Sequence, residues 1–296
     1  TATTEIYTLS LHDALPIFGS GAEYAEFVDL NKLGAVVTKG VANVPWPGNP
    51  TPRVAEVYGG MLNAVGLQNP GIDLFVERDI PFLKQFDTKI MVNVCGHSTE
   101  EYIEVVERLS DQPVDLLEIN ISCPNVKEGG IAFGQDPKAV EAITKEMKKH
   151  AAQPVIMKLS PNVTDITEMA RAAEAGGADG LSLINTITGM KIDINRQKFV
   201  LANKTGGMSG PAIHPVAVRM VYQTAQAVSI PIVGMGGIMN AEDAIEMILA
   251  GATAVSVGTA NFTNPHVTEE IVAGIRDYME RYQVADIRDL VGAVHE

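Results

Sequence analysis

Seven short, almost uninterrupted apolar segments rich in β-branched residues alternate along this chain with stretches of helical character. The segments are residues 34–40, 89–96, 116–122, 154–161, 180–185, 230–237 and 253–260. Strands that are apolar on both faces are typical of parallel sheets that helices cover on both sides. The chain is therefore predicted to have an α/β fold built from successive βα units.

The stretches between these segments carry helix-boundary signals. Asp136 and Pro137 suit the N-cap and the first turn of a helix that ends in lysines. Two further stretches reach Gly176 and Gly251, which suit left-handed C-caps. Seven such units fit an open doubly wound sheet or an eight-stranded barrel.

The chain length favours the barrel. The chain has 296 residues, and about 250 residues is typical of one (β/α)8 TIM barrel. The eighth strand must then precede residue 34, and we expect it at "DALPIF", residues 13–18. We predict a single barrel domain over residues 18–296, preceded by an atypical, foreign-looking segment at residues 1–17.

Two connections are too long to be simple loops. Residues 41–88 and 186–214 are rich in glycine, asparagine or proline, and each follows the carboxyl end of a predicted strand. Long connections in a compact domain are usually functional, and this end of the strands is the catalytic face of a TIM barrel. We therefore expect long inserted loops over the active site.

The composition excludes several classes of function. The net charge of −14 argues against nucleic acid or an anionic membrane surface as a partner. The two cysteines, Cys95 and Cys123, are too few for a four-thiolate metal site or an iron–sulfur cluster. No apolar run approaches the ~20 residues of a membrane helix. We expect a cytoplasmic protein without a metal site.

Polar residues gather at the carboxyl ends of the predicted strands. They include two lysines, several asparagines and glycine-containing turns: Lys39, Asn93, Asn120, Cys123, Asn125, Lys158, Asn185, Thr186, Gly236, Gly237, Gly258 and Thr259. A single asparagine at a strand end commonly makes a turn. Several amides opposite two lysines instead indicate a binding site, because an amide complements a ring edge that alternates C=O and N–H. The late glycine turns suit a phosphate group.

Longer motifs identify a family resemblance. "EINISCPN", "NAVGLQNPG", "VIMKLSPNVTDI", "GGMSGPAIHPVAVRMVY" and "PIVGMGGI" together resemble dihydroorotate dehydrogenases from Phe18 to the C-terminus. The loop "MLNAVGLQNPG" resembles the FMN-bearing catalytic subunit of the class 1B, NAD-linked enzymes more than class 1A. The resemblance implies oxidation of (S)-dihydroorotate to orotate in pyrimidine biosynthesis, with hydride passing to FMN and a proton to a cysteine base.

The resemblance also implies a role for each matching position. The base is Cys123. The implied substrate-binding residues are Lys39, Asn63, Ala64, Val65, Gly66, Leu67, Asn120, Asn125, Asn185 and Thr186. The implied FMN-binding residues are Lys39, Gly40, Asn93, Asn120, Lys158, Ile184, Gly210, Gly236, Gly237, Gly258 and Thr259.

The electron acceptor points to a partner protein. The sequence lacks a Rossmann dinucleotide motif. The resemblance implies an iron–sulfur flavoprotein subunit that carries FAD and a [2Fe–2S] cluster, in a heterotetramer of two of each chain built on a homodimer of this one.

The segment before Phe18 departs from the family pattern. The family usually has an "ASGT"-like turn here, whereas this chain has Ala14-Leu15-Pro16-Ile17. Proline lacks a backbone hydrogen-bond donor. This departure leaves open an inactive fragment with a damaged N-terminus. A related FMN barrel that acts on dihydropyrimidines stays open as the other enzyme reading. A phosphate-binding barrel without flavin is a further possibility.

Overall fold

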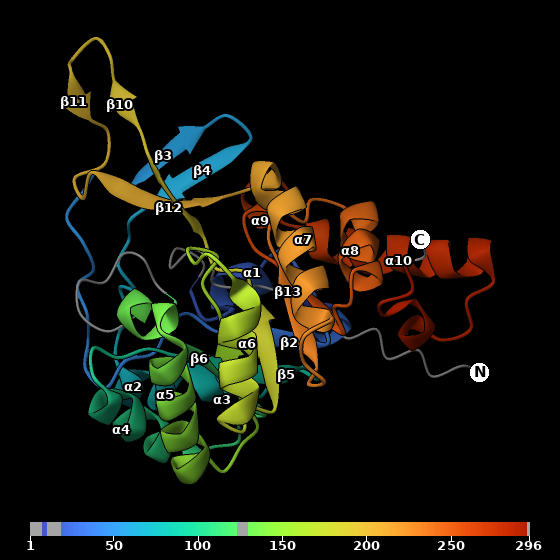
Figure 1. Cartoon of the computed structure of the whole chain (residues 1–296), viewed down its shortest axis with the longest axis horizontal. Helices are drawn as coiled ribbons and strands as arrows, with labels where there is room; N and C mark the ends of the chain where they lie inside the picture. The colour runs from blue at the N-terminus through green and yellow to red at the C-terminus, as the bar shows by residue number, and fades with distance from the viewer. Residues whose placement is uncertain (1–7, 11–18, 123–129, 295–296) are drawn as a thin grey trace.

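The computed structural model describes residues 8–10, 19–122 and 130–294, and within them eight parallel strands close into a barrel (Figure 1). The order around the barrel is β1-β14-β13-β8-β7-β6-β5-β2. The strands are β1 (Thr8–Ser10), β2 (Ala35–Val37), β5 (Lys89–Val94), β6 (Leu116–Asn120), β7 (Val155–Lys158), β8 (Gly180–Leu183), β13 (Ile232–Met235) and β14 (Ala254–Val257). The predicted barrel is confirmed, and seven strands lie inside the predicted segments.

The position predicted for the eighth strand is wrong. The strand that pairs with both β14 and β2 is β1, Thr8–Ser10, whereas residues 13–18 lie outside the described residues. The strand was missed because "TLS" lies in no apolar run, unlike the equally short β2. The sequence of residues 1–17 is unusual, but part of it belongs to the barrel wall.

Helices follow the strands around the outside of the barrel. They are α1 (Ala22–Ala25), α2 (Ile72–Leu74), α3 (Ile80–Leu83), α4 (Thr99–Ser110), α5 (Pro137–His150), α6 (Ile166–Ala175), α7 (His214–Ala225), α8 (Ala241–Leu249), α9 (Ala260–Thr263) and α10 (Val267–Tyr282). Asp136 caps α5 as predicted, accepting from the Lys138 amide at 3.2 Å. Gly251 is left-handed, with φ +120°, but Gly176 has φ −71° and its neighbour Gly177 takes the left-handed position instead.

The barrel interior changes from apolar to polar along the strands. Successive residues of a strand point to opposite faces, so one set of side chains points outward to the helices and the other inward. The inward set begins with a small apolar cluster that includes Val37, Met91 and Ile156. Two residues further along β5 and β7 the inward positions hold Asn93 and Lys158. The polar layer therefore lies at the carboxyl ends of the strands.

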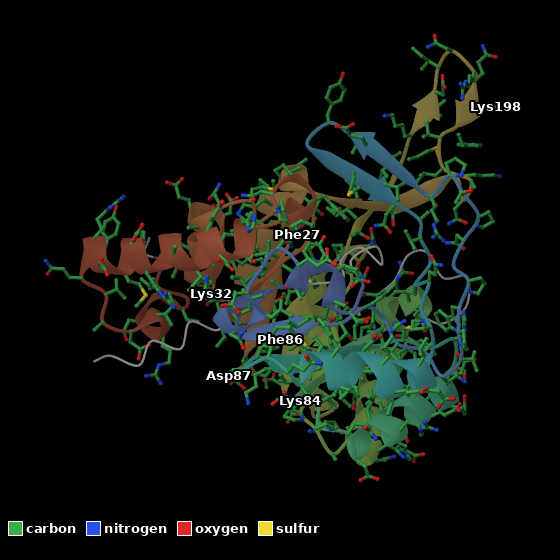
Figure 2. The ribbon with its side chains drawn as sticks, turned by 180° about the vertical axis from the view of Figure 1, so that it is seen from behind. Phe27, Lys32, Lys84, Phe86, Asp87 and Lys198 are labelled. Atoms are coloured by element: carbon green, nitrogen blue, oxygen red, sulfur yellow. The ribbon has the colours of Figure 1, made fainter. Side chains whose placement is uncertain are left out.

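The two long connections meet above this polar layer. They contribute β3 (Val54–Val57), β4 (Gly60–Asn63), β9 (Ile187–Met190) and β12 (Thr205–Ser209) to one antiparallel sheet with the order β3-β4-β12-β9. A hairpin of β10 (Ile192–Asp193) and β11 (Lys198–Phe199) extends outward beyond it (Figures 1 and 2). The predicted loops thus form a second sheet over one side of the catalytic face.

The described residues contain neither a membrane-spanning helix nor a cluster of metal ligands. None of the helices there is both long and apolar enough to cross a membrane. Likewise, histidine, cysteine and carboxylate side chains of the described ranges do not gather in any group of three that could hold a metal ion.

Candidate active site

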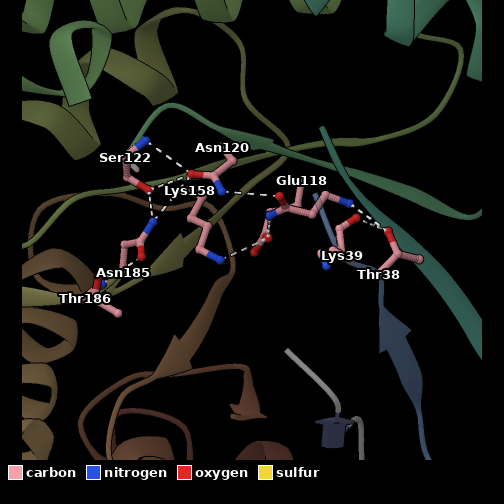
Figure 3. A network of polar contacts seen from close by, with 9 residues as sticks. Thr38, Lys39, Glu118, Asn120, Ser122, Lys158, Asn185 and Thr186 are labelled. Carbon is pink, nitrogen blue, oxygen red and sulfur yellow. Dashed lines mark hydrogen bonds and ion pairs between the residues drawn. The ribbon is translucent and has the colours of Figure 1, made fainter. Parts of the chain in front are cut away.

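A buried hydrogen-bond network connects three neighbouring strands of the barrel (Figure 3). Glu118 on β6 lies at its centre and accepts a hydrogen bond from the Asn93 amide of β5. The Lys158 ammonium of β7 lies 3.4 Å from the same Glu118 oxygen, Oε2. All three side chains are fully buried. The barrel register explains the contact, because β6 pairs with β5 on one side and β7 on the other.

The network continues toward β8 through Asn120. Its amide donates to Asn93 Oδ1 at 3.2 Å, and its Oδ1 accepts from the Ser122 hydroxyl at 3.0 Å. The Asn185 amide donates to Ser122 Oγ at 2.7 Å, and Asn185 Oδ1 accepts from the Thr186 backbone N–H at 2.7 Å. The structure therefore brings these predicted residues into one connected arrangement of fixed donors and acceptors.

Lys39 and Gly40 follow the end of β2 and lie at the Asn93 end of the network. The Lys39 backbone N–H donates to the Gly19 carbonyl at 3.1 Å, and the Thr38 hydroxyl donates to the Lys39 carbonyl at 3.1 Å. Gly40 is tightly enclosed, since a Cβ there would lie 3.3 Å from Asn93 Oδ1. The half-buried Lys39 side chain lies at the mouth of the barrel.

The predicted substrate loop, residues 63–67, is buried and continues from the end of β4 in the second sheet. Asn63 ends β4, and its amide donates to the Gly207 carbonyl of β12 at 3.4 Å. Gly66 and Leu67 both have positive φ, at +76° and +52°. This backbone turn brings Leu67 against Gly40, where the glycine's missing Cβ would be 3.2 Å from Leu67 Cδ2.

A cavity at the ends of β8, β13 and β14 is lined by five of the eleven predicted cofactor residues. Its lining residues are Ile184, Asn185, Thr186, Ser209, Ile213, Met235, Gly236, Gly237, Ser256, Gly258 and Thr259. Gly210 is adjacent, since a Cβ on Gly237 would lie 2.8 Å from its carbonyl oxygen. Asn185 and Thr186 belong to both the cavity and the network, so the two groups of residues form one continuous site.

The cavity offers polar groups suited to a phosphate-bearing ligand. The hydroxyls of Ser209 and Ser256 are buried and make no hydrogen bond to any described residue. Gly236 and Gly237 have φ of +133° and +68°, a conformation that glycine adopts without strain. Unused hydroxyls and glycine turns at late barrel strands are features that fit FMN, whose phosphate needs short-range donors.

Two predicted residues cannot be placed. Cys123 and Asn125 lie outside the described residues. Ser122, the last described residue before them, belongs to the network and directly precedes Cys123. Their assignment as base and substrate ligand stays a prediction.

Four residues of the site were missed in the sequence. Glu118, Ser122, Ser209 and Ser256 are buried and polar within it. The signal for Glu118 was present, because it interrupts the apolar run "LLEINIS" at an inward position. The serines carry no such signal, since serine is common in loops and at strand ends.

Together these features define the class of protein. A closed (β/α)8 barrel with a connected layer of amides, an ion pair and glycine turns at its carboxyl-terminal face is a barrel enzyme with its active site at that face. The family described as "Dihydroorotate dehydrogenase" matches residues 7–279. The chain belongs to this family.

Curated relatives agree with the family match. The chain is 73% identical over 277 residues to "Dihydroorotate dehydrogenase B (NAD(+)), catalytic subunit" of Lachnoclostridium phytofermentans, covering 94% of this chain and 92% of that protein. It is 64% identical to the protein of the same name in Alkaliphilus metalliredigens, with the same coverage. A crystal structure of a dihydroorotate dehydrogenase from Eimeria tenella, in complex with ferulenol, aligns with a TM-score of 0.79 at 22% identity. That alignment covers 96% of this chain and 84% of the other, and it supports the fold.

Proposed function

We propose that this chain oxidises (S)-dihydroorotate to orotate and passes the electrons through FMN and a partner subunit to NAD⁺. The observation that carries the proposal is the continuous site from Asn93 to Gly237 in a member of this family. FMN, when bound, supplies the hydride acceptor. The chain's own residues bind and orient the substrate, and exclude water from it.

The amides of the network suit a pyrimidine ring. Asn120 and Asn185 are held by hydrogen bonds to Asn93 and Ser122, so their orientations are set before a ligand binds. Such preorganisation lowers the cost of ordering the site on binding. Lys39 and Lys158 add positive charge for the substrate carboxylate and for the pyrimidine edge of the flavin. Asn63 and the 63–67 loop are proposed to cover the substrate from above.

Removal of the substrate proton is assigned to Cys123, on the grounds of the motif "EINISCPN". A cysteine base takes a proton only as a thiolate, and a free thiol has a pKa near 8.5. We propose that this residue removes the proton from C5 while hydride leaves C6. The Asn120–Ser122–Asn185 contacts anchor the chain directly before it.

The absorption spectrum of the purified protein tests this function. We expect a flavin spectrum, which anaerobic dihydroorotate bleaches and which orotate perturbs without bleaching. Dihydrouracil should bleach it far more slowly, because it lacks the carboxylate. A colourless protein that does not take up added FMN would contradict the proposal. Equal bleaching by dihydrouracil would contradict the assignment of dihydroorotate as the substrate.

The partner is proposed from the relatives' names, which call them catalytic subunits. We propose an iron–sulfur flavoprotein with FAD and a [2Fe–2S] cluster, two of each chain in the assembly, and a cytoplasmic location. Alone, this chain should pass electrons from dihydroorotate to an artificial dye but hardly to NAD⁺. Efficient NAD⁺ reduction by the isolated chain would contradict this.

The homodimer is supported by the hairpin of β10 and β11. Ile192, Ile194 and Phe199 are 54%, 82% and 46% exposed there, and Met190 of β9 is 50% exposed. The hairpin projects from the barrel, with Lys198 near its outer end (Figure 2). Exposed apolar side chains of this kind are typical of protein–protein contacts.

A further inference from the structure

Glu118 is a fully buried carboxylate whose function the motifs do not assign. It connects the Asn93 amide and the Lys158 ammonium, which come from the strands on either side of its own. Met91 and Ile156 fill nearby inward positions on the two flanking strands, so this barrel accepts apolar side chains at such sites.

Stability gives no strong reason to keep this ion pair. Taking a carboxylate and an ammonium out of water costs several kcal/mol per ion, and apolar replacements of buried pairs are often equally or more stable. Removing only one partner is costly, because it leaves a buried charge uncompensated. The pair lies at the boundary between the apolar layer and the site.

We propose that Glu118 is a positioning residue that holds Lys158 and Asn93 in place and offsets the lysine's charge, so that it lowers the reduction potential of the bound flavin. This inference rests on the proposed function, because it requires FMN at this end of the barrel. Reduction adds negative charge to the flavin. A nearby ammonium favours that change, and a carboxylate beside the ammonium opposes it.

The three charge states of the pair predict an order of potentials. Glu118→Gln keeps the shape and the contact to Asn93 but leaves one net positive charge, so the midpoint potential rises. Lys158→Met leaves one net negative charge, so the potential falls. The double variant has neither charge and returns close to the wild type. A tenfold change in the two-electron equilibrium corresponds to about 30 mV, and we expect shifts of at least this size.

The experiment is an anaerobic dye-coupled titration of the FMN-loaded chain and its three variants, together with FMN affinity from fluorescence quenching. Glu141→Gln is the matched control, since Glu141 pairs with Lys145 on the exposed face of α5, away from the barrel interior. Its potential and FMN affinity should equal those of the wild type. A role of Glu118 in folding alone would move stability but would not give shifts of opposite sign.

The outcomes separate this inference from the proposed function. FMN uptake by the wild type with equal potentials in wild type and Glu118→Gln would overturn the role of Glu118 and leave the function intact. If Glu118→Gln does not fold, equal potentials in Lys158→Met and the double variant would overturn it. Failure of the wild type to take up FMN would overturn both.

Discussion

At the scale of single residues, the alternation of side chains along a strand decides which of them point into the barrel and reach the site. Asn93, Asn120 and Lys158 were predictable because each stands near the carboxyl end of a clear apolar run. Glu118 was not predicted, because a strand is recognised by its apolar majority and a single acid within it is read as an exception. The role of Glu118 depends on the side chains that the neighbouring strands place beside it. Local sequence does not show which strands pair.

The two cysteines give a direct test at this scale. Cys123→Ala should bind FMN and orotate but slow flavin reduction by dihydroorotate by ~10²–10⁴-fold, the usual cost of losing a general base. Cys95→Ala is the matched control, because Cys95 is fully buried beside Ala42 and Trp46 and behaves as a small apolar side chain. Stopped-flow absorbance of the flavin measures both. Near-normal reduction in Cys123→Ala would remove the residue from the mechanism.

At the scale of elements, seven of the eight barrel strands were predictable from their apolar runs, and α5 from its capping signals. The strands of the second sheet were not, since β4 and β12 contain glycines that suit a loop as well. Their pairing joins Asn63 to Gly207, which are far apart in the sequence. Such contacts depend on the closed barrel, so no local pattern predicts them.

The helix that follows the Gly236–Gly237 turn provides a test at this scale. Asn240 caps α8 by accepting from the Asp243 amide at 3.1 Å, while Asp243 Oδ2 accepts from the Met239 N–H at 2.8 Å. Asn240→Ala should lower the free energy of unfolding by about 1 kcal/mol. Because the cap also orders the turn before the helix, FMN affinity should fall as well.

Ser98→Ala is the control for that variant. Ser98 caps α4, which follows β5 rather than the glycine turns, by accepting from the Glu101 amide at 3.4 Å. It should reduce stability in urea unfolding without weakening FMN binding. Equal FMN affinity in Asn240→Ala and wild type would show that the turn is ordered independently of the helix cap.

At the scale of the whole molecule, contacts outside the sheet connect distant parts of the chain. Near the last helix, Glu269 of α10 accepts from the Asp29 backbone N–H at 2.9 Å and pairs with Lys32 at 3.1 Å. The hydrogen bond from Asp29 is the largest cause that lowers the pKa of the Glu269 carboxyl. These contacts join residues about 240 positions apart.

This contact predicts a pH dependence of stability. A carboxyl whose pKa is lower in the folded than in the unfolded state stabilises the fold at neutral pH and loses that contribution as pH falls through the folded pKa. The difference in unfolding free energy between wild type and Glu269→Gln should therefore be largest near pH 7. It should shrink between about pH 5 and pH 3.

The size of this effect is on the order of 1 kcal/mol or less, because the pair is partly exposed. Urea unfolding across this pH range measures it. Glu280→Gln, an exposed site on the same helix, is the control and should leave the pH profile unchanged. A constant difference between wild type and Glu269→Gln at all pH values would show that the carboxylate charge makes no contribution.

The shared sheet of β3, β4, β12 and β9 has a consequence for how such barrels can be engineered and can diverge. Each long connection completes the hydrogen bonding of the other, since β4 and β12 pair directly. Grafting one connection from a related barrel would leave its partner strand with a mismatched edge. The two segments therefore form one exchangeable module, and substrate preference should transfer between relatives only when both are exchanged together.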